Sequence, residues 1–247
     1  DGGEIAGVVI EPLIQGANEM RLWPEGMLRE LRAWCDRVGT FLIADEVMTG
    51  FGRTGTLFAC EREGVVPDFV ALAKGITGGY LPLAATLTTR RVFEGFLGGG
   101  ERTFFYGHSY TGNALACAVA LESLAIFREE GVMERLQTQI AWMGELLERE
   151  LKGLPWVYEV RQCGLVAGIE LREPGGGRFG PERGVGKAVC LEARRHGLLT
   201  RPIRDTVVLM PPYCISACDL ERAVGAIARS VQGVLGGGAG DGIGARN

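Results

Sequence analysis

The sequence predicts an α/β protein in which a large domain with a mainly parallel sheet is followed by a smaller α+β domain. Short apolar runs alternate with helical segments along the 247 residues, which is the pattern of strands connected by helices. Two apolar runs end near charged side chains, Asp45 and Lys74, where open α/β sheets bind their ligands. Past Pro155 the pattern changes to a smaller unit of strands and helices, which indicates a second domain.

These changes along the chain set the expected domain boundaries. We place the first domain at residues 1–150 and the second at residues 151–235. Residues 236–247 are rich in glycine and predict a disordered tail. A chain of this length can bury a large core and can hold one or two domains.

Four strands are expected in the first domain. Each is a short apolar run that is bounded by turn residues or by a helical segment. The runs lie at residues 6–10, 40–45, 68–72 and 82–88. The run that ends at Asp45 is apolar throughout, as in a buried parallel strand.

Three helices accompany these strands. The segment 23–39 has Pro24 near its start and Gly39 in the position of a C-cap. The segment 112–130 is rich in alanine and is expected to form a long, mostly buried helix. A further helix is predicted over residues 132–154.

The second domain is expected to contain strands within 157–171 and at 207–213, and helices at 186–197 and 217–233. The stretch "GGGRFG" at 175–180 satisfies the pattern G-x-G-x-x-G, but it does not follow a strand directly. We therefore interpret it as a solvent loop.

The charge balance argues against binding of nucleic acid or of a membrane surface. The 26 Lys and Arg residues are scattered among 30 Asp and Glu residues, and the formal net charge is −4. The apolar stretches end well short of the roughly 20 residues that a transmembrane helix needs. A small-molecule partner is therefore expected. The chain shows no signal peptide, but it begins at Asp1, which is typical of a piece of a longer protein.

Seven cysteines predict reduced thiols in a cytoplasmic protein, because their number is odd and their spacing is not paired. Only Cys214 and Cys218 lie close together in the sequence. Since the chain has just two histidines, no metal site is expected.

Two other motif interpretations have little support. The run ending in Asp45 and Glu46 is typical of a Walker B strand. The nearest candidate for a phosphate loop, "PERGVGKAV", has Pro181 and Ala188 at positions that require Gly and Ser or Thr. The stretch "GHSYT" suggests a nucleophile elbow, but Thr111 stands where the last glycine belongs.

Lys74 follows its strand about one strand–connection–strand unit after Asp45, so the two side chains are expected at one edge of the sheet. A lysine among apolar residues can serve as an amine nucleophile toward carbonyls. Pyridoxal phosphate needs such a lysine and a carboxylate that faces its pyridine nitrogen. The alternative is a surface lysine and an aspartate that caps a turn.

The stretch "ADEVMTGFGRTGTLFACEREGVVPDFVALAKGITGGYLPLAATLTT" resembles the core of the class III aminotransferases, which are fold type I pyridoxal phosphate enzymes. "LFACE", "FFYGHSYTGN" and "LMPPY" are particularly similar to the diaminopelargonic acid aminotransferases of biotin synthesis, and the similarity extends from Gly7 to Gln232. The resemblance implies pyridoxal 5′-phosphate as cofactor and a homodimer with shared active sites. It also implies transfer of an amino group to 8-amino-7-oxononanoate, with S-adenosylmethionine or lysine as donor.

The resemblance further implies roles for five residues. Asp45 would bind the pyridine nitrogen, and Lys74 would carry the cofactor covalently and move a proton. Val47 matches the position that packs against the ring, and it would point the same way as Asp45 if the chain stays extended. Ser109 would reach the cofactor phosphate of the neighbouring subunit. Arg201 would pair with a substrate carboxylate through its planar guanidinium.

Arg53 in "GFGRTG" and His108 in "GHSY" complete the predicted substrate-binding residues. Arg53 is expected to orient neighbouring groups more than to perform chemistry. For His108 a packed position is an equal alternative, and for Arg201 the alternative is a structural arginine that caps a strand.

Two features depart from the family pattern. The related ornithine and 4-aminobutyrate enzymes have an acid where this chain has Ala17 after its "EP" motif, which makes those activities less expected. The chain also resembles only the C-terminal part of the family, without the phosphate-binding turn and the stacking aromatic residue. An ω-amino acid:pyruvate aminotransferase and a noncatalytic fragment of the same fold remain as alternatives.

Overall fold

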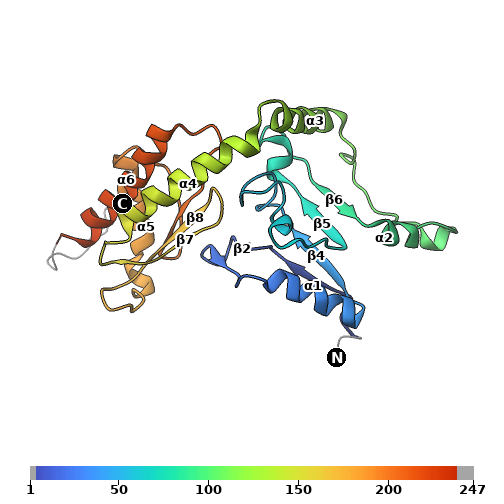
Figure 1. Cartoon of the computed structure of the whole chain (residues 1–247), viewed down its shortest axis with the longest axis horizontal. Coiled ribbons are helices and arrows are strands. Elements are labelled where there is room, and N and C mark those ends of the chain that lie inside the picture. Colours follow the sequence, from blue (N-terminus) through green and yellow to red (C-terminus); the bar gives the residue numbers. More distant parts are fainter. Residues whose placement is uncertain (1–3, 238–247) are drawn as a thin grey trace. The chain divides into compact units, whose positions relative to one another are not determined.

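The computed structural model describes residues 4–237, which Figure 1 colours from blue to red. The chain divides into two compact units. Unit 1 consists of Asp1–Gly16, Arg21–Ile140 and Cys163–Leu165, and unit 2 consists of Ala17–Met20, Ala141–Gln162 and Val166–Asn247. None of the helices that residues 4–237 form is long and apolar enough to cross a membrane.

Unit 1 is an α/β unit built on a four-stranded sheet. Its strands are β1 (Gly7–Ile10), β2 (Ile14–Gln15), β3 (Arg21–Leu22), β4 (Phe41–Asp45), β5 (Phe69–Leu72) and β6 (Ala85–Thr88). Its α-helices are α1 (Met27–Val38), α2 (Arg90–Gly95), α3 (Ala114–Glu129) and the start of α4 (Val132–Leu151). Short 3-10 turns are η2 (Ala59–Glu63), η3 (Lys74–Thr77) and η4 (Gly100–Arg102).

The sheet has the strand order β1-β4-β5-β6. β1 pairs in parallel with β4, and β4 pairs in parallel with β5, with Asp45 opposite Ala71. β6 runs antiparallel to β5, because the connection between them contains only the turn η3 and no crossover helix. The four predicted strands are therefore confirmed, and three of them form the expected parallel part.

The helix α1 covers the sheet of unit 1 through an apolar face that includes Leu28 and Cys35. It ends at Gly39, whose φ of 74° is the left-handed conformation predicted for a C-cap. Apolar side chains from β1, β4 and η2 complete this core; the fully or largely buried ones are Ile10, Leu42, Ala44, Cys60 and Val65.

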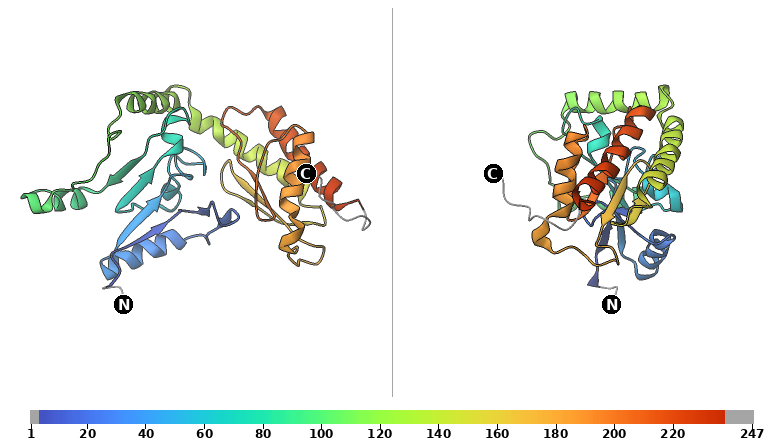
Figure 2. Two further views of the ribbon diagram at one scale, coloured as in Figure 1. Left: turned by 180° about the vertical axis from the view of Figure 1, so that it is seen from behind. Right: turned by 90° about the vertical axis from the view of Figure 1, so that its left-hand side faces the viewer.

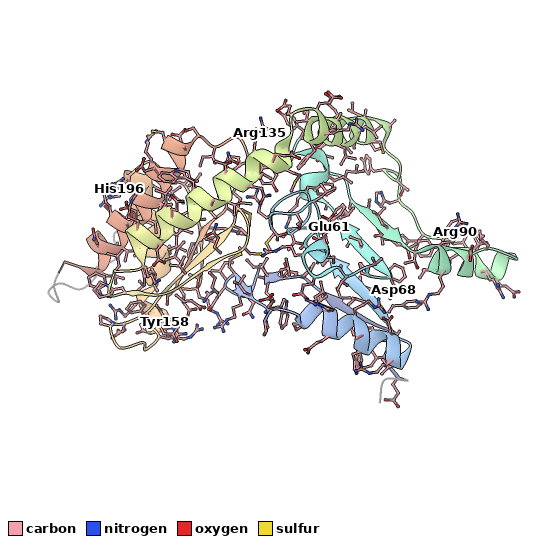
Figure 3. The ribbon with its side chains drawn as sticks, in the orientation of Figure 1. Glu61, Asp68, Arg90, Arg135, Tyr158 and His196 are labelled. Carbon is pink, nitrogen blue, oxygen red and sulfur yellow. The ribbon has the colours of Figure 1, made fainter. Side chains whose placement is uncertain are left out.

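Asp68, labelled in Figure 3, fastens the start of β5 to three other elements. Its Oδ2 accepts hydrogen bonds from the backbone N–H of Leu42 at 2.9 Å and from Arg32 of α1 at 2.7 Å. Its Oδ1 accepts one from Arg91 of α2 at 2.8 Å. Burial alone would raise the pKa of Asp68, but these hydrogen bonds and the charge of Arg32 lower it.

The predicted helix over 112–130 forms as α3, but its predicted burial is wrong. Asn113 caps it, since its Oδ1 accepts a hydrogen bond from the backbone N–H of Ala116 at 3.1 Å. Only Ala116 and Ala120 are buried in α3, whereas Leu115 is 67% and Leu121 69% exposed. No part of residues 4–237 covers these leucines, so α3 presents an apolar face.

Unit 2 contains a four-stranded antiparallel sheet of order β7-β8-β10-β9. Its elements are the end of α4, β7 (Val157–Gln162), β8 (Ala167–Leu171), η5 (Pro181–Arg183), α5 (Val185–Arg195), β9 (Pro202–Ile203), β10 (Thr206–Leu209) and α6 (Ala217–Leu235). Helix α5 contacts β9 and β10 and lies alongside α6 (Figure 2). The "GGGRFG" stretch forms a loop, as predicted, and residues 238–247 of the predicted tail lie outside the described residues.

Candidate active site

The three parallel strands of unit 1 bring charged side chains to one edge of the sheet. Glu11 follows β1 directly, Asp45 is the last residue of β4, and Lys74 comes two residues after β5. Because the strands run in the same direction, these ends share the edge where α/β sheets bind ligands. Asp45 and Lys74 thus meet at this edge as predicted, and Glu11 joins them.

Glu11 was not among the predicted site residues. Its Oε2 accepts a hydrogen bond from the backbone N–H of Gly16 at 3.0 Å. Burial raises the pKa of Glu11, and the charge of Asp45 raises it further, while the Gly16 hydrogen bond and Lys74 act in the opposite sense. The signal was present in the sequence, because "VVIEP" is another apolar run that ends in an acid.

Asp45 uses only one of its two carboxylate oxygens in a hydrogen bond. Its Oδ1 accepts a hydrogen bond from the backbone N–H of Val47 at 3.1 Å, and Oδ2 has no partner within residues 4–237. The chain turns here, since the N–H of Gly50 donates to the carbonyl of Glu46 at 2.9 Å. The premise that the chain stays extended to Val47 is therefore wrong, because the turn starts right after β4.

Lys74 opens the turn η3 with a left-handed backbone conformation, at φ 45°. A residue other than glycine in this region costs on the order of 1–3 kcal/mol and persists where the surroundings fix it. The next residue must be small, since a Cβ on Gly75 would lie 3.0 Å from the Phe51 side chain. The side chain of Lys74 is exposed and forms no ion pair with residues 4–237, so its amine is accessible.

Glu46, next to Asp45, fixes the loop that follows. Its side chain is fully buried, at 0% exposure. One oxygen accepts hydrogen bonds from the backbone N–H of Ala59 at 3.0 Å and from the hydroxyl of Thr49 at 2.5 Å, and the other accepts one from Cys60. The sequence interpretation missed this role, because two of the partners lie more than ten positions away.

Arg53 holds the same loop against residues 163–165. Its guanidinium donates a hydrogen bond to the carbonyl of Leu165 at 2.8 Å, and the N–H of Leu165 donates to the carbonyl of Arg53 at 2.9 Å. Gly164 makes this approach possible, because a Cβ there would lie 2.4 Å from the carbonyl oxygen of Arg53. These contacts fix the loop, and a role of Arg53 in orienting groups around a substrate stays a prediction.

Ser109 and His108 lie in an exposed turn before α3. The Nδ1 of His108 accepts a hydrogen bond from the backbone N–H of Tyr110 at 3.1 Å. The backbone N–H of His108 donates a hydrogen bond to the hydroxyl of Thr111. His108 is therefore not packed within the described part of the chain. Neither Ser109 nor His108 forms a hydrogen bond with the residues at the sheet edge of unit 1.

Arg201 lies in unit 2, just before β9, and its side chain is exposed. Its carbonyl accepts a hydrogen bond from the N–H of Val208 at 3.3 Å. Its guanidinium has no ion-pair partner within residues 4–237. The backbone of Arg201 thus joins the hairpin, whereas its side chain is left accessible to a ligand.

The comparison with protein families decides the relationship. The family described as "Aminotransferase class-III" matches residues 1–231. The chain belongs to this family. Class III aminotransferases are pyridoxal phosphate-dependent transaminases, and the predicted family and cofactor class are confirmed at this level.

Two curated relatives of this class III aminotransferase chain carry one name, adenosylmethionine-8-amino-7-oxononanoate aminotransferase. The protein from Nitratidesulfovibrio vulgaris is 52% identical over 250 residues, which cover 98% of this chain and 45% of the relative. The protein from Geobacter sulfurreducens is 48% identical over 246 residues, which cover 95% of this chain and 52% of the relative. The chain spans about half the length of the curated relatives it matches.

Solved structures confirm the predicted fold type I architecture. The crystal structure of the adenosylmethionine-8-amino-7-oxononanoate aminotransferase from Methanocaldococcus jannaschii has a TM-score of 0.89 at 37% identity, covering 93% of this chain and 54% of that one. A thermostable (S)-enantioselective omega-transaminase from Thermomicrobium roseum has a TM-score of 0.88, also at 37% identity, covering 94% and 51%.

Proposed function

We propose that the protein containing this chain is an aminotransferase that moves an amino group to 8-amino-7-oxononanoate and gives 7,8-diaminononanoate for biotin synthesis. S-adenosylmethionine or lysine would be the donor. The observation that carries the proposal is the meeting of Asp45 and Lys74 at one edge of the parallel sheet. The shared name of the two curated relatives supports the choice of substrate.

The residues at this edge fit pyridoxal phosphate. When bound, the cofactor supplies an electron sink for the carbon that loses its proton. Asp45 would use its Oδ2 to hold a proton on the pyridine nitrogen, while its Oδ1 stays on Val47. Lys74 would present its accessible amine to the carbonyl carbon of the cofactor. The same amine would carry a proton between the substrate Cα and that cofactor carbon. Val47 is proposed to contact the ring from the turn that follows β4.

The substrate side is proposed to consist of Arg201, Arg53 and His108. Arg201 has an accessible guanidinium that can bind a carboxylate with two parallel hydrogen bonds. Arg53 already donates to Leu165, so it would shape the site while retaining that contact. His108 is exposed beside Ser109 and could reach a substrate bound at a neighbouring subunit.

A second copy of the chain is the proposed partner, with Ser109 reaching the cofactor phosphate of that copy. The segment around Ser109 is apolar and exposed: Phe105 is 85% and Tyr110 75% accessible. Together with the exposed leucines of α3, these side chains form an exposed apolar surface of the kind that dimer interfaces cover.

We further propose that residues 1–150 contribute to the cofactor-binding domain and 151–235 to the small domain. A cytoplasmic location is proposed as well, because all seven cysteines are free, as is usual where thiols stay reduced.

Chemical fixation of the cofactor tests the role of Lys74. The sequence contains only two other lysines, Lys152 and Lys187, so a peptide map is easy to interpret. After incubation with pyridoxal phosphate and borohydride, the label is expected on Lys74, to disappear in Lys74→Ala and to remain in the control Lys152→Ala. A label confined to Lys152 or Lys187 would overturn the assignment.

A chimera tests the reaction. This chain replaces the matching half of the Nitratidesulfovibrio vulgaris relative, and formation of diaminononanoate is measured with adenosylmethionine or lysine as donor. We expect turnover with one of these donors and none in the Lys74→Ala chimera. Turnover only with pyruvate and simple amines would favour an ω-transaminase, the second candidate, which the likeness to the Thermomicrobium roseum structure supports. A folded chimera that cannot bind cofactor would favour the noncatalytic alternative.

Two variants of the chimera refine the assignment. Arg201→Lys keeps the charge but loses the planar fork, so catalytic efficiency with the carboxylate substrate should fall about ten- to hundredfold, or roughly 1.4–2.8 kcal/mol. Reaction with amines that lack a carboxylate should change little. Mixing inactive Lys74→Ala and Ser109→Glu subunits should restore part of the activity, because one site of a mixed dimer then carries neither change.

A further inference from the structure

Unit 2 contains a cationic cavity that the proposed reaction does not use. Its volume is about 490 Å³, which lies within the range of small-molecule sites. Three cationic side chains line it, Arg178, Lys187 and Arg204, together with Asp205. The rest of the wall is formed by Phe179, Pro181 and Gly184.

Two acids near the cavity, Glu19 and Asp205, are already engaged. Glu19 is buried, and its Oε1 accepts hydrogen bonds from Arg178 at 3.2 Å and from Arg204 at 3.3 Å. One carboxylate therefore serves two guanidinium groups. Asp205 accepts a hydrogen bond from the backbone N–H of Gly186 at 2.8 Å, at the start of α5.

The cationic side chains of the cavity have more N–H donors than these two carboxylates can accept. Lys187 forms no ion pair with residues 4–237, and it lies in the first turn of α5, where the helix dipole also favours an anion. The side chain of Arg204 is 75% exposed and donates to Glu19 through a single nitrogen, Nη1. Arg178 also lies 3.8 Å from Oε1 of Glu170, but that carboxylate already pairs with Arg161 and Arg172. Apart from this shared carboxylate, Arg178, Lys187 and Arg204 face Glu19 and Asp205, so three positive charges face two negative ones.

Arg204 also occupies a position that does not suit it. Its φ is 52°, in the left-handed region that glycine or asparagine adopts more readily. It forms the tip of the hairpin between β9 and β10. Backbone strain at a residue other than glycine is typical of functional sites. The strained backbone of Arg204, beside two other cations, therefore indicates that its guanidinium has a function.

We infer that this cavity binds a small organic molecule through a phosphate or carboxylate group. Lys187, Arg178 and Arg204 would donate to the anionic group, and Phe179 with Pro181 would contact an apolar part of the same molecule. A small molecule bound at this site would regulate the protein or be held by it. The site would be separate from the reaction at Lys74, because all the residues that line it belong to unit 2.

Binding of phenyl phosphate to the chain tests the inference, because this probe combines one phosphate with one apolar ring. Its affinity is measured by calorimetry, and sodium chloride of equal ionic strength is the salt control. Inorganic phosphate and benzoate are titrated in the same way for comparison. Arg204→Gly removes the guanidinium and suits the backbone, so the hairpin should still form. Lys187→Gln is the second variant. Lys152→Gln, directly after α4, is the matched control, since Lys152 lies outside the cavity.

We expect phenyl phosphate to bind more tightly than inorganic phosphate, and each cavity variant to weaken it about tenfold or more, as for the loss of a hydrogen bond to a charged group. The control should bind like the unchanged chain. If benzoate binds more tightly than phenyl phosphate, the site is selective for carboxylates. If phenyl phosphate binds more tightly than benzoate, the site is selective for phosphates. Absence of binding at millimolar concentrations, or equal binding by both cavity variants and the unchanged chain, would overturn the inference.

Discussion

Glu46 accepts a hydrogen bond from the backbone N–H of Cys60 at 2.9 Å, across 14 positions of the chain. The two residues therefore close the loop that contains the "GFGRTG" motif. Since Glu46 directly follows Asp45, the same buried carboxylate fixes both the end of β4 and the far end of the loop. Burial, followed by the negative charge of Glu46, raises the pKa of the Cys60 thiol strongly, so this thiol stays protonated.

Replacing Glu46 by Gln should destabilise unit 1. The amide offers one acceptor oxygen and turns an N–H group toward the backbone donors of Ala59 or Cys60, so a buried donor is left unpaired. We expect a loss of about 2 kcal/mol in the free energy of unfolding, measured by urea denaturation. Glu61→Gln, at an exposed position of the same turn, is the control and should stay within about 0.5 kcal/mol. Equal midpoints for both variants would contradict the anchoring role.

Replacing Gly164 by Ala should separate the loop from residues 163–165. The backbone of Gly164 has φ 62°, and a Cβ would lie 2.4 Å from the carbonyl oxygen of Arg53. Strain and overlap together should lower the free energy of unfolding by about 3 kcal/mol. Gly153→Ala is the matched control, because nothing lies within 4 Å of its added Cβ. A tolerated Gly164→Ala would show that the contact between Arg53 and Leu165 can rearrange freely.

Asp68→Asn should weaken the junction of β5 with α1 and α2. The amide can still accept from Leu42, but it no longer pairs with the positive charges of Arg32 and Arg91. We expect a loss of about 2–3 kcal/mol at neutral pH. Arg91→Gln is the control, and it should cost less than about 1 kcal/mol because Arg91 is mostly exposed.

The pH dependence of the Asp68 variant follows from the lowered pKa of this carboxyl group. The stability that Asp68 contributes is fully present above its pKa in the unfolded chain, about 3.9, and is lost as the pH falls through the lower folded value. The difference in unfolding free energy between the unchanged chain and Asp68→Asn should therefore be constant at neutral pH and shrink in acid. A difference that grew below about pH 4 would refute this linkage.

The charges at the sheet edge should be visible in the titration of Glu11. Because the charge of Asp45 raises the pKa of Glu11 and that of Lys74 lowers it, Asp45→Asn should shift the titration down and Lys74→Ala should shift it up. The measurement is the carboxyl carbon signal of Glu11 by NMR as a function of pH. Shifts in the same direction in both variants would contradict the placement of Glu11 near both of these charges.

The strand ends were the most predictable part of this chain. An apolar run that stops at an acid or just before a lysine marks a buried parallel strand and its ligand edge at once, and Asp45 and Lys74 were found in this way. The same rule applied to "VVIEP" would have found Glu11. Regular helices such as α1 were also predictable, because the apolar spacing and Gly39 mark them locally.

Features that depend on distant parts of the chain were not predictable. Glu46 has partners on η2, and Glu19 has partners more than 150 positions away, so no local pattern marks either. The turn at Val47 is fixed by hydrogen bonds from Gly50 and to Asp45, which override an extended chain. The exposure of α3 could not be read from its alanine-rich composition, since composition does not show what covers a helix.

Lys74 has a left-handed backbone conformation that destabilises the fold, unlike Glu11 and Asp45 at the same sheet edge. Glycine would relieve the left-handed strain of about 1–3 kcal/mol, and its added freedom in the unfolded chain would take back only about 0.5–1 kcal/mol. Lys74→Gly should therefore leave the chain as stable as before or more so, although it removes the amine. Selection for stability and selection for the amine chemistry proposed for Lys74 would thus favour different amino acids at this position. A search for heat-resistant variants that ignored turnover would accept the loss of the lysine.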